Sequence, residues 1–168
     1  YLYVPKSVAE YETISETAKK RGARLRKIDA SRGAAVQIVE ASPKGYQLQI
    51  ETEPVQFSFA NAAWVSNLAL AVQVAIDSGI QASQVLRAVR SFRPAAGRMQ
   101  LRRGRFTVID DGYNANPDSA IASIDSALQI AAGRPVICIF GEFKELGKFS
   151  KTLRQWTGSE AAKKGVAA

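Results

Sequence analysis

The chain has 168 residues, a net charge of +8 and 46% hydrophobic residues, a composition typical of one medium or two small globular domains. It has no histidine and one cysteine, Cys138, so histidine bases, histidine metal ligands and internal disulfides are excluded within it. No apolar run reaches the roughly 20 residues of a membrane span, and no signal peptide is recognisable. We therefore expect a cytoplasmic protein with no membrane partner.

The basic residues are scattered along the chain and are not interleaved with aromatic side chains. A basic chain can bind nucleic acid through its phosphates, but this distribution favours a solvated surface with a few phosphate contacts. We expect a small anionic ligand and no nucleic acid. Salt-dependent retention on DNA is the observation that would favour a nucleic-acid binder instead.

The start of the chain predicts a strand, a helix and a second strand. Leu2–Val4 has the pattern of a strand end, and residues 23–28 have the pattern of the next strand. Between them, Ser7 and Glu10 have the spacing of a capping box, in which each side chain bonds the backbone N–H of the other residue. Apolar residues then recur at helical spacing until Gly22, which is expected to end the helix.

Residues 34–59 alternate between apolar and polar side chains with a period of two, which predicts an antiparallel meander. Turn-forming residues at 42–45 separate its first two strands. Two helices are expected next, at 62–78 and 82–92. The second is expected to bury one face and to turn Arg87 and Arg90 away; the residues of the buried face are Ala82, Val85, Leu86, Val89 and Phe92.

Proline and glycine in the stretch 93–97 mark the expected boundary between two domains, 1–96 and 97–168. The sequence pattern of the second domain predicts secondary-structure elements in the order β-β-α-β-α. Its expected strands lie at 99–102, 106–110 and 135–140, and its expected helices at 117–133 and 152–164.

Two local signals stand out in the second domain. Asn116 and Pro117 suit the N-cap and first positions of the helix that follows, and Gly133 suits its end. The run 135–140 is wholly apolar, which is typical of a central parallel strand buried on both faces. Cys138, inside this run, is therefore expected to be a buried small hydrophobic residue.

Ligand-capable side chains gather in the sequence IDDGYNANPDS at 109–119, between a strand and a helix. If the strands 106–110 and 135–140 are parallel neighbours joined by a right-handed crossover, their carboxyl ends share the sheet edge where such folds bind ligands. The loop 141–150 leaves the same edge and carries Glu142 and Lys144. Solvated surface charge is the alternative explanation for those two residues.

Individual residues of the first loop have competing explanations. A carboxylate directly after a strand, such as Asp110 or Asp111, can accept hydrogen bonds from the two hydroxyls of a ribose, or it can form an Asx-turn. Asn116 is explained by capping, whereas Tyr113 and Asn114 are less easily explained in that way.

Arg98, next to Gly97, can hold a phosphate or can be a solvated surface residue. Its position at the expected domain boundary is the reason to consider the first explanation.

The run from Gly97 to Gly147 resembles the start of the C-terminal domain of the Mur ligase family. The motifs that carry the resemblance are Asp-Asp-x-Tyr-Asn-Ala-Asn-Pro-Asp-Ser at 110–119 and Gly-Glu-x-x-Glu-Leu-Gly at 141–147. Within the family they match the branch that adds D-alanyl-D-alanine. The folylpolyglutamate synthases share the fold but have a shorter Asp-Gly-Ala-His-Asn-Pro loop.

Upstream, residues 59–98 are similar to the end of the family's central ATPase domain, where Gly-x-His-Asn-x-x-Asn opens a helix. Asn61, Ala63 and Trp64 stand at the first three defined positions, and only Asn67 matches. The implied fold is α/β: the end of a central ATPase domain, an antiparallel meander plus helices, followed by a partial Rossmann-like C-terminal domain. The resemblance implies that Asn67 contacts adenine, while Trp64 can stack on a base or pack in a core.

The resemblance implies a ligase of peptidoglycan precursor synthesis that uses ATP and Mg²⁺. Such a ligase joins a dipeptide such as D-Ala-D-Ala to a UDP-MurNAc-peptide through an acyl phosphate, with nucleotide and peptide substrates. On this match Asp111 holds the ribose with Asp110 beside it, and Arg98 contacts nucleotide or phosphate. The face that closes over ATP and substrate is lined by Tyr113, Asn114, Asn116, Glu142 and Lys144.

The chain contains no Gly-x-x-Gly-Lys-Thr/Ser phosphate loop. We expect that loop and the Mg²⁺ ligands in an upstream segment of the same protein, of which this chain would be a fragment. Two alternatives stay open: a degenerate, non-catalytic Mur-ligase-like binding module, which the missing loop favours, and a folylpolyglutamate-synthase-like ligase, which the YNANP form at 113–117 disfavours.

We predict that the 168 residues alone do not catalyse ligation, because the loop that neutralises the transferred phosphoryl group is missing from them. Amide formation from ATP, an acyl peptide and D-Ala-D-Ala, measured with the purified chain, should stay at the level of a protein-free control. ATP-dependent amide formation above that control would contradict the prediction.

Overall fold

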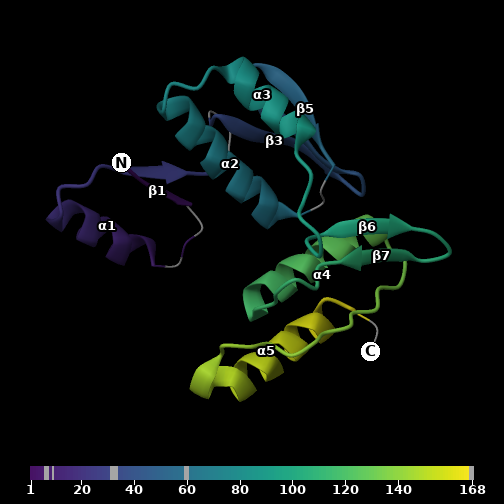
Figure 1. The fold of residues 1–168 in the computed structure, drawn as a ribbon. Coiled ribbons are helices and arrows are strands. Elements are labelled where there is room, and N and C mark those ends of the chain that lie inside the picture. The colour runs from purple at the N-terminus through teal and green to yellow at the C-terminus, as the bar shows by residue number, and fades with distance from the viewer. Residues whose placement is uncertain (6–7, 9, 31–33, 59–60, 167–168) are drawn as a thin grey trace. The chain divides into compact units, whose positions relative to one another are not determined.

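The computed structural model describes residues 1–5, 8, 10–30, 34–58 and 61–166. The chain divides into two compact units, whose elements are labelled in Figure 1. The first unit comprises residues 1–41, 46–58 and 62–92, and the second comprises 42–45, 59–61 and 93–168. The assignment of 1–96 and 97–168 to two ligase domains stays a prediction.

The first unit opens with β1 (Leu2–Pro5), α1 (Tyr11–Lys20) and β2 (Leu25–Ile28). The two strands pair in parallel, with Leu2 opposite Leu25. A parallel pair needs a crossover connection, which α1 supplies. The predicted order of strand, helix and strand is confirmed.

The predicted capping box at the start of α1 is wrong for Glu10, and Ser7 lies outside the described residues. The helix begins at Tyr11, so Glu10 is its N-cap residue and makes no side-chain capping bond. In a capping box the glutamate occupies the third helical position. The backbone N–H of Tyr11 instead bonds the carbonyl of Val8 at 3.2 Å, as part of a turn before the helix.

The predicted meander is confirmed as β3 (Val36–Ser42), β4 (Gly45–Ile50) and β5 (Glu53–Phe57), hydrogen-bonded in that order. The pairing of β4 with β5 is antiparallel, with Leu48 opposite Val55. Both of these side chains are buried. Alternate positions of a strand point to the same face, so the period-two pattern of the sequence places one row of apolar residues in the core.

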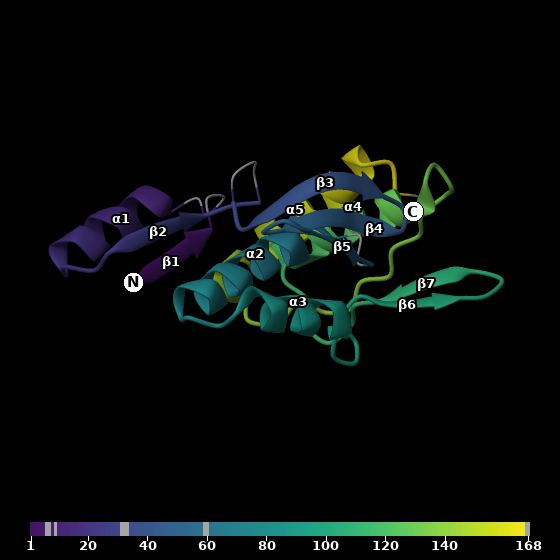
Figure 2. The same cartoon turned by 90° about the horizontal axis from the view of Figure 1, so that it is seen from above.

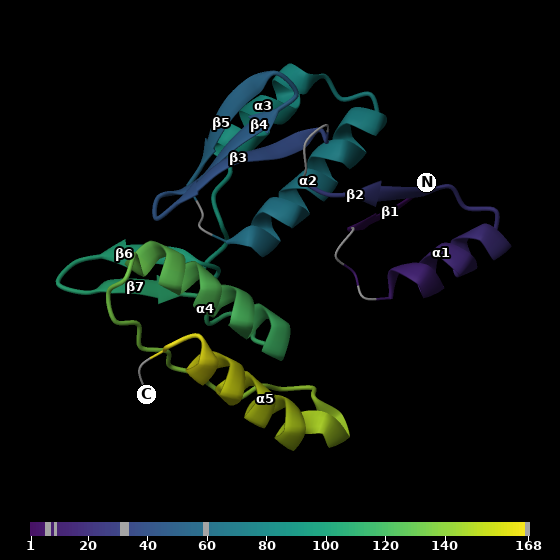
Figure 3. The same ribbon diagram turned by 180° about the vertical axis from the view of Figure 1, so that it is seen from behind.

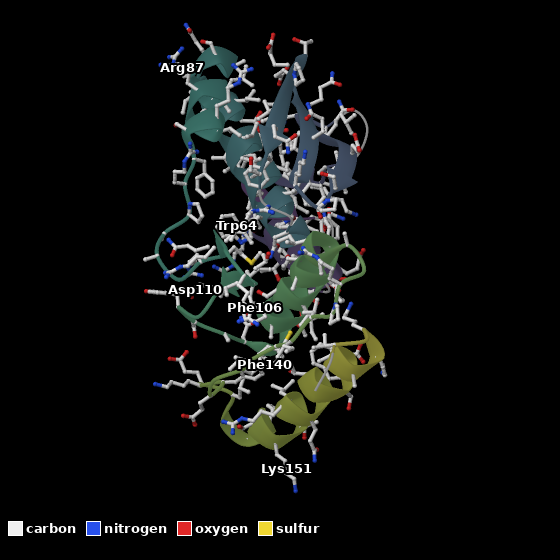
Figure 4. All side chains as sticks on the ribbon, turned by 90° about the vertical axis from the view of Figure 1, so that its right-hand side faces the viewer. Trp64, Arg87, Phe106, Asp110, Phe140 and Lys151 are labelled. Atoms are coloured by element: carbon white, nitrogen blue, oxygen red, sulfur yellow. The ribbon has the colours of Figure 1, made fainter. Side chains whose placement is uncertain are left out.

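Two helices follow, α2 (Ala62–Asp77) and α3 (Ala82–Ser91), and α3 lies along β5 (Figure 1). The predicted buried face of α3 is confirmed at its centre and wrong at its ends, where Ala82 is the first helical residue and Phe92 follows the last one. Val85, Leu86 and Val89 are buried, whereas Ala82 and Phe92 are exposed. Figure 4 shows Arg87 pointing away from the unit, as predicted.

The C-terminal end of α2 is joined to the first strands of the unit by one carboxylate. Asp77 accepts a hydrogen bond from the hydroxyl of Tyr3 at 2.9 Å and forms an ion pair with Arg26 at 3.3 Å.

Within the described ranges, no helix is both long enough and apolar enough to span a bilayer.

The second unit contains a hairpin of β6 (Gln100–Arg103) and β7 (Thr107–Asp110), which Figure 2 shows as a two-stranded ribbon. The strands are antiparallel, with Gln100 opposite Asp110 and Arg103 opposite Thr107. The hairpin turn and Asp110 therefore lie at opposite ends of the ribbon.

Three helical segments follow the hairpin: α4 (Pro117–Ala131), the 3₁₀ turn η1 (Gly147–Phe149) and α5 (Ser150–Lys163). Figure 3 shows α4 and α5 side by side. Lys164, at the end of α5, donates to Asp125 of α4 at 2.6 Å. The two predicted helices are confirmed.

The start of α4 follows the predicted cap, and its end differs by one residue. Asn116 is the N-cap: its side chain accepts the Ser119 N–H at 2.8 Å, and Pro117 occupies the first helical position. At the other end, Ala132 already has the left-handed conformation, with φ 50°, and Gly133 follows with φ 88°.

The predicted central strand at 135–140 is wrong. The structure has only an isolated bridge at Ile137, whose side chain is 76% exposed, and Ile139 is 94% exposed. A wholly apolar strand is held in a sheet by burial of both faces, and among the described residues nothing covers these side chains. The parallel crossover unit from 106 to 140 is therefore not formed, and the sheet of this unit consists of β6 and β7.

Cys138, in the same run, is half-buried and free, so the prediction of a buried residue is wrong in degree. Partial burial still raises the pKa of its thiol, because the thiolate loses hydration there.

We predict that Ile139→Ala changes stability by less than about 0.5 kcal/mol, as for an exposed position. The matched variant Ile124→Ala, in the core of α4, should cost about 2–5 kcal/mol, because Ile124 is 1% exposed and leaves a cavity. Urea unfolding followed by circular dichroism measures both. Equal losses for the two variants would show that 135–140 is buried after all.

Candidate functional site

The turn before β6 and the loop after β7 are bonded to each other. The backbone N–H of Tyr113 donates to the carbonyl of Gly97 at 3.0 Å. Gly97 has φ +68°, and a Cβ at this position would lie 3.2 Å from the Tyr113 nitrogen. A glycine is therefore favoured at this position both by its backbone conformation and by the close approach of the neighbouring chain.

The same contact brings two predicted site residues together. The guanidinium carbon of Arg98 lies 4.5 Å from the centre of the Tyr113 ring, within the range of a cation–π interaction. Tyr113 is otherwise 70% exposed, and Arg98 is exposed as well. The result is a cationic group on the surface whose orientation is restricted by an aromatic ring.

Asp111 is the most connected side chain of the loop. Its Oδ1 accepts the backbone N–H of Met99 at 3.0 Å, and its Oδ2 accepts the hydroxyl of Ser123 of α4 in a short contact. Asp111 is half-buried. One carboxylate therefore joins the turn before β6, the end of β7 and the helix α4.

Asp110 has a different environment. Its Oδ1 accepts the N–H of Gly112 at 3.3 Å, and its Oδ2 lies 3.6 Å from Arg102 of the neighbouring strand. The first bond is the Asx-turn that the sequence left as an alternative. The second is an exposed ion pair, worth at most about 1 kcal/mol. Figure 4 labels Asp110 in the second unit.

The two asparagines are held by local backbone bonds. Asn114 accepts the N–H of Ala115 at 2.9 Å. Asn116 caps α4, and the Ser119 hydroxyl accepts the Asn116 N–H at 3.0 Å in return. Capping, the alternative to a binding role for Asn116, is therefore present, and it occupies the carbonyl oxygen of that side chain.

The second predicted loop is attached to α5. Glu142 lies 3.5 Å from Arg154, and the same guanidinium donates to the carbonyl of Phe143 at 3.2 Å. Phe143 is buried, and Lys144 is exposed. Across the described residues, no hydrogen bond or ion pair joins this loop to the loop 110–116, so the structure does not bring the two predicted groups into contact.

Asn67 belongs to the first unit, where it is exposed on α2. In the same unit, the Trp64 ring meets Phe92 edge-on at 5.6 Å, and Phe92 stacks on Phe57 at 6.3 Å. Figure 4 labels Trp64. Packing in an aromatic cluster is therefore the explanation of Trp64 that the structure favours.

Two site residues were missed by the sequence interpretation, Met99 and Ser123. Met99 is an apolar residue that acts through its backbone N–H, which no side-chain pattern reports. Ser123 lies next to buried Ile124. Its hydroxyl, among the apolar residues of a helix, was the only feature of the sequence that could have indicated a role in the site. A serine in that position usually bonds its own helix backbone.

The resemblance to the Mur ligases implies that the protein uses Mg²⁺. Hard cations such as Mg²⁺ take oxygen ligands, chiefly carboxylates and waters. In the part of the chain that the structure describes, no three cysteine, aspartate or glutamate side chains gather as a metal site would require. The described residues therefore do not form a Mg²⁺ site by themselves.

Part of the chain is similar in sequence to known ligases. Residues 97–167 match the family model described as Mur ligase, glutamate ligase domain. The UDP-N-acetylmuramoyl-tripeptide–D-alanyl-D-alanine ligase of Mycobacterium tuberculosis is 40% identical over 91 residues, which are 50% of this chain and 18% of that protein. The predicted resemblance to the Mur ligases, and to this branch of them, is confirmed.

Solved structures extend the likeness to nearly the whole chain. MurF from Acinetobacter baumannii matches with a TM-score of 0.79 and 25% identity, over 98% of this chain and 36% of that chain. The MurF ligase of Thermotoga maritima in complex with ADP has the same fold, with a TM-score of 0.72 at 17% identity, over 95% of this chain and 38% of that one. The predicted fold class is confirmed, and the chain spans well under half the length of these relatives.

We predict that Gly97→Ala destabilises the second unit more than Gly133→Ala does. Both glycines have positive φ, but only Gly97 faces a neighbour, Tyr113, while the space around Gly133 is open. Strain from φ costs each variant about 1–3 kcal/mol, and crowding should add about 1 kcal/mol or more at Gly97. Urea unfolding measures the difference, and equal losses would show that the contact with Tyr113 adjusts freely.

Proposed function

We propose that this chain, whose residues 97–167 match the Mur ligase family, is part of an ATP-dependent ligase of peptidoglycan precursor synthesis. The proposed reaction joins D-Ala-D-Ala to a UDP-MurNAc-peptide, as the name of a relative suggests, and it is proposed to take place in the cytoplasm. The observation that carries the proposal is the cluster of Arg98, Asp111 and Tyr113 within the matched region. The ADP complex of a protein with the same fold supports a nucleotide as the ligand.

The chemistry of such a ligase is a phosphoryl transfer from ATP to a carboxylate, followed by attack of an amine on the acyl phosphate. The negative charge of the phosphates must be neutralised by cationic groups and by backbone N–H donors. The role proposed for this chain is to hold the nucleotide, with its phosphates and its ribose bound by different side chains.

Asp111 is proposed to bind the ribose. An ionised carboxylate offers about four lone-pair positions, and the bonds from Met99 and Ser123 use two of them. Acceptor capacity therefore remains for vicinal hydroxyl groups. Asp110 is proposed to be a neighbour of the ribose, since its Asx-turn shapes the loop.

Arg98 is proposed to contact the phosphates. A guanidinium is always charged and presents its donors in a planar fork that matches phosphate oxygens. The Tyr113 ring, 4.5 Å away, restricts the orientation of that fork before a ligand arrives. Less conformational freedom is then lost on binding.

The remaining predicted roles are proposals with less support. Tyr113, which belongs to the cluster, and its neighbour Asn114 are exposed and are proposed to face the substrate. Glu142 and Lys144 are proposed to do so from the separate loop on α5, and Asn116 from the start of α4. In the first unit, the exposed Asn67 is proposed to contact adenine.

The chain supplies only part of such a site. The phosphate loop is proposed to lie in an upstream segment of the same protein, together with the ligands of Mg²⁺. No step that depends on the metal is assigned to the described residues, because they do not gather a set of metal ligands.

We predict that the chain binds ADP and that Arg98→Ala weakens this binding about tenfold, the value of one charge-assisted hydrogen bond. Arg103→Ala is the matched control, since it removes the same charge from an exposed arginine of β6, toward the hairpin turn. Isothermal titration calorimetry at fixed salt gives both affinities. Equal losses would show only a general attraction of anions to a basic chain, and no binding of ADP would contradict the proposed site.

A further inference from the structure

We infer that Ser123 of α4 is a positioning residue, which aims the carboxylate of Asp111 at the ribose of a bound nucleotide. The inference rests on the proposed function, because it specifies how the ribose contact of that site is made. Its basis is the hydroxyl of Ser123, which donates to Oδ2 of Asp111 while the N–H of Met99 donates to Oδ1.

The two donors come from different elements and bind different oxygens. Met99 lies in the turn before β6, and Ser123 lies in the second turn of α4. A carboxylate held through one oxygen can rotate about its own bonds, whereas one held through both oxygens has its plane fixed. The lone pairs left on the two oxygens then point in fixed directions, as preorganised recognition requires.

The backbone on the other side of the carboxylate is strained. Met99 has φ 48°, in the left-handed region that non-glycine residues rarely adopt, and its side chain is buried. Such conformations persist where surrounding bonds hold them, and they are concentrated at functional sites. Asp111 accepts the N–H of this residue, so the carboxylate and the strained turn hold each other in place.

A second serine of the same helix shows what an ordinary hydroxyl does there. Ser126 is buried and donates to the carbonyl of Ala122, four residues earlier, at 2.7 Å. That bond stays within the helix and is the usual arrangement for a helical serine. The hydroxyl of Ser123 instead reaches a side chain of the neighbouring loop.

The experiment compares the affinities of the chain for ADP and for 2′,3′-dideoxy-ADP, which lacks both ribose hydroxyls. The ratio of the two dissociation constants isolates the ribose contact, because the phosphates and the base are the same in both probes. The variants are Ser123→Ala, which removes the donor, Ser123→Thr, which retains a hydroxyl, and Ser126→Ala as the matched control. Circular dichroism establishes that each variant is folded at the temperature used.

We expect the unaltered chain to prefer ADP by about tenfold or more, the value of hydrogen bonds to a charged acceptor. Ser123→Ala should reduce the preference to about threefold or less, while Ser123→Thr and Ser126→Ala keep it. A merely structural role of Ser123 would weaken both probes equally and leave the ratio unchanged, which would overturn the inference alone. If the unaltered chain does not distinguish the probes, the proposed ribose contact itself is wrong.

Discussion

The loop geometry of the second unit depends on the two hydrogen bonds that the carboxylate of Asp111 accepts. By accepting the N–H of Met99 and the hydroxyl of Ser123, it ties a turn, a strand end and a helix to one point. Removing the carboxylate would leave the buried Met99 N–H without its acceptor and the left-handed turn without its support. The same atoms are those proposed to bind a ribose, so folding and binding use one group at this position.

The antiparallel register of β6 and β7 explains why the site is compact. Gln100 faces Asp110 across the ribbon, so the residues just before β6 and just after β7 are neighbours in space. Gly97 and Tyr113 are therefore bonded, and Arg98 lies over the Tyr113 ring. The cation proposed to contact phosphates and the carboxylate proposed to bind the ribose are thus placed by a single antiparallel hairpin.

Local features of this region were predictable from the sequence, and features set by distant partners were not. The cap at Asn116, the alternating strands of the meander and the loop carboxylates follow from spacing within a few residues. The bond from Ser123 to Asp111 depends on how α4 crosses the hairpin, which no local pattern encodes. The strand expected at 135–140 failed for a related reason: its apolar composition was recognised, but burial depends on neighbours that the described residues do not provide.

Because residues 135–140 do not form a strand, the proposed site is not part of a parallel sheet among the described residues. Ile137 and Ile139 are exposed, so the run that contains them contributes little burial to the second unit. The hydrophobic contacts of this unit come instead from α4, whose Ala120 and Ile124 are buried, and from α5 beside it. Since Ser123 is adjacent to Ile124 on α4, the core that stabilises the helix also fixes the donor to Asp111. The geometry of the proposed ribose contact is therefore set by the packing of α4, and it does not require that residues 135–140 form a strand.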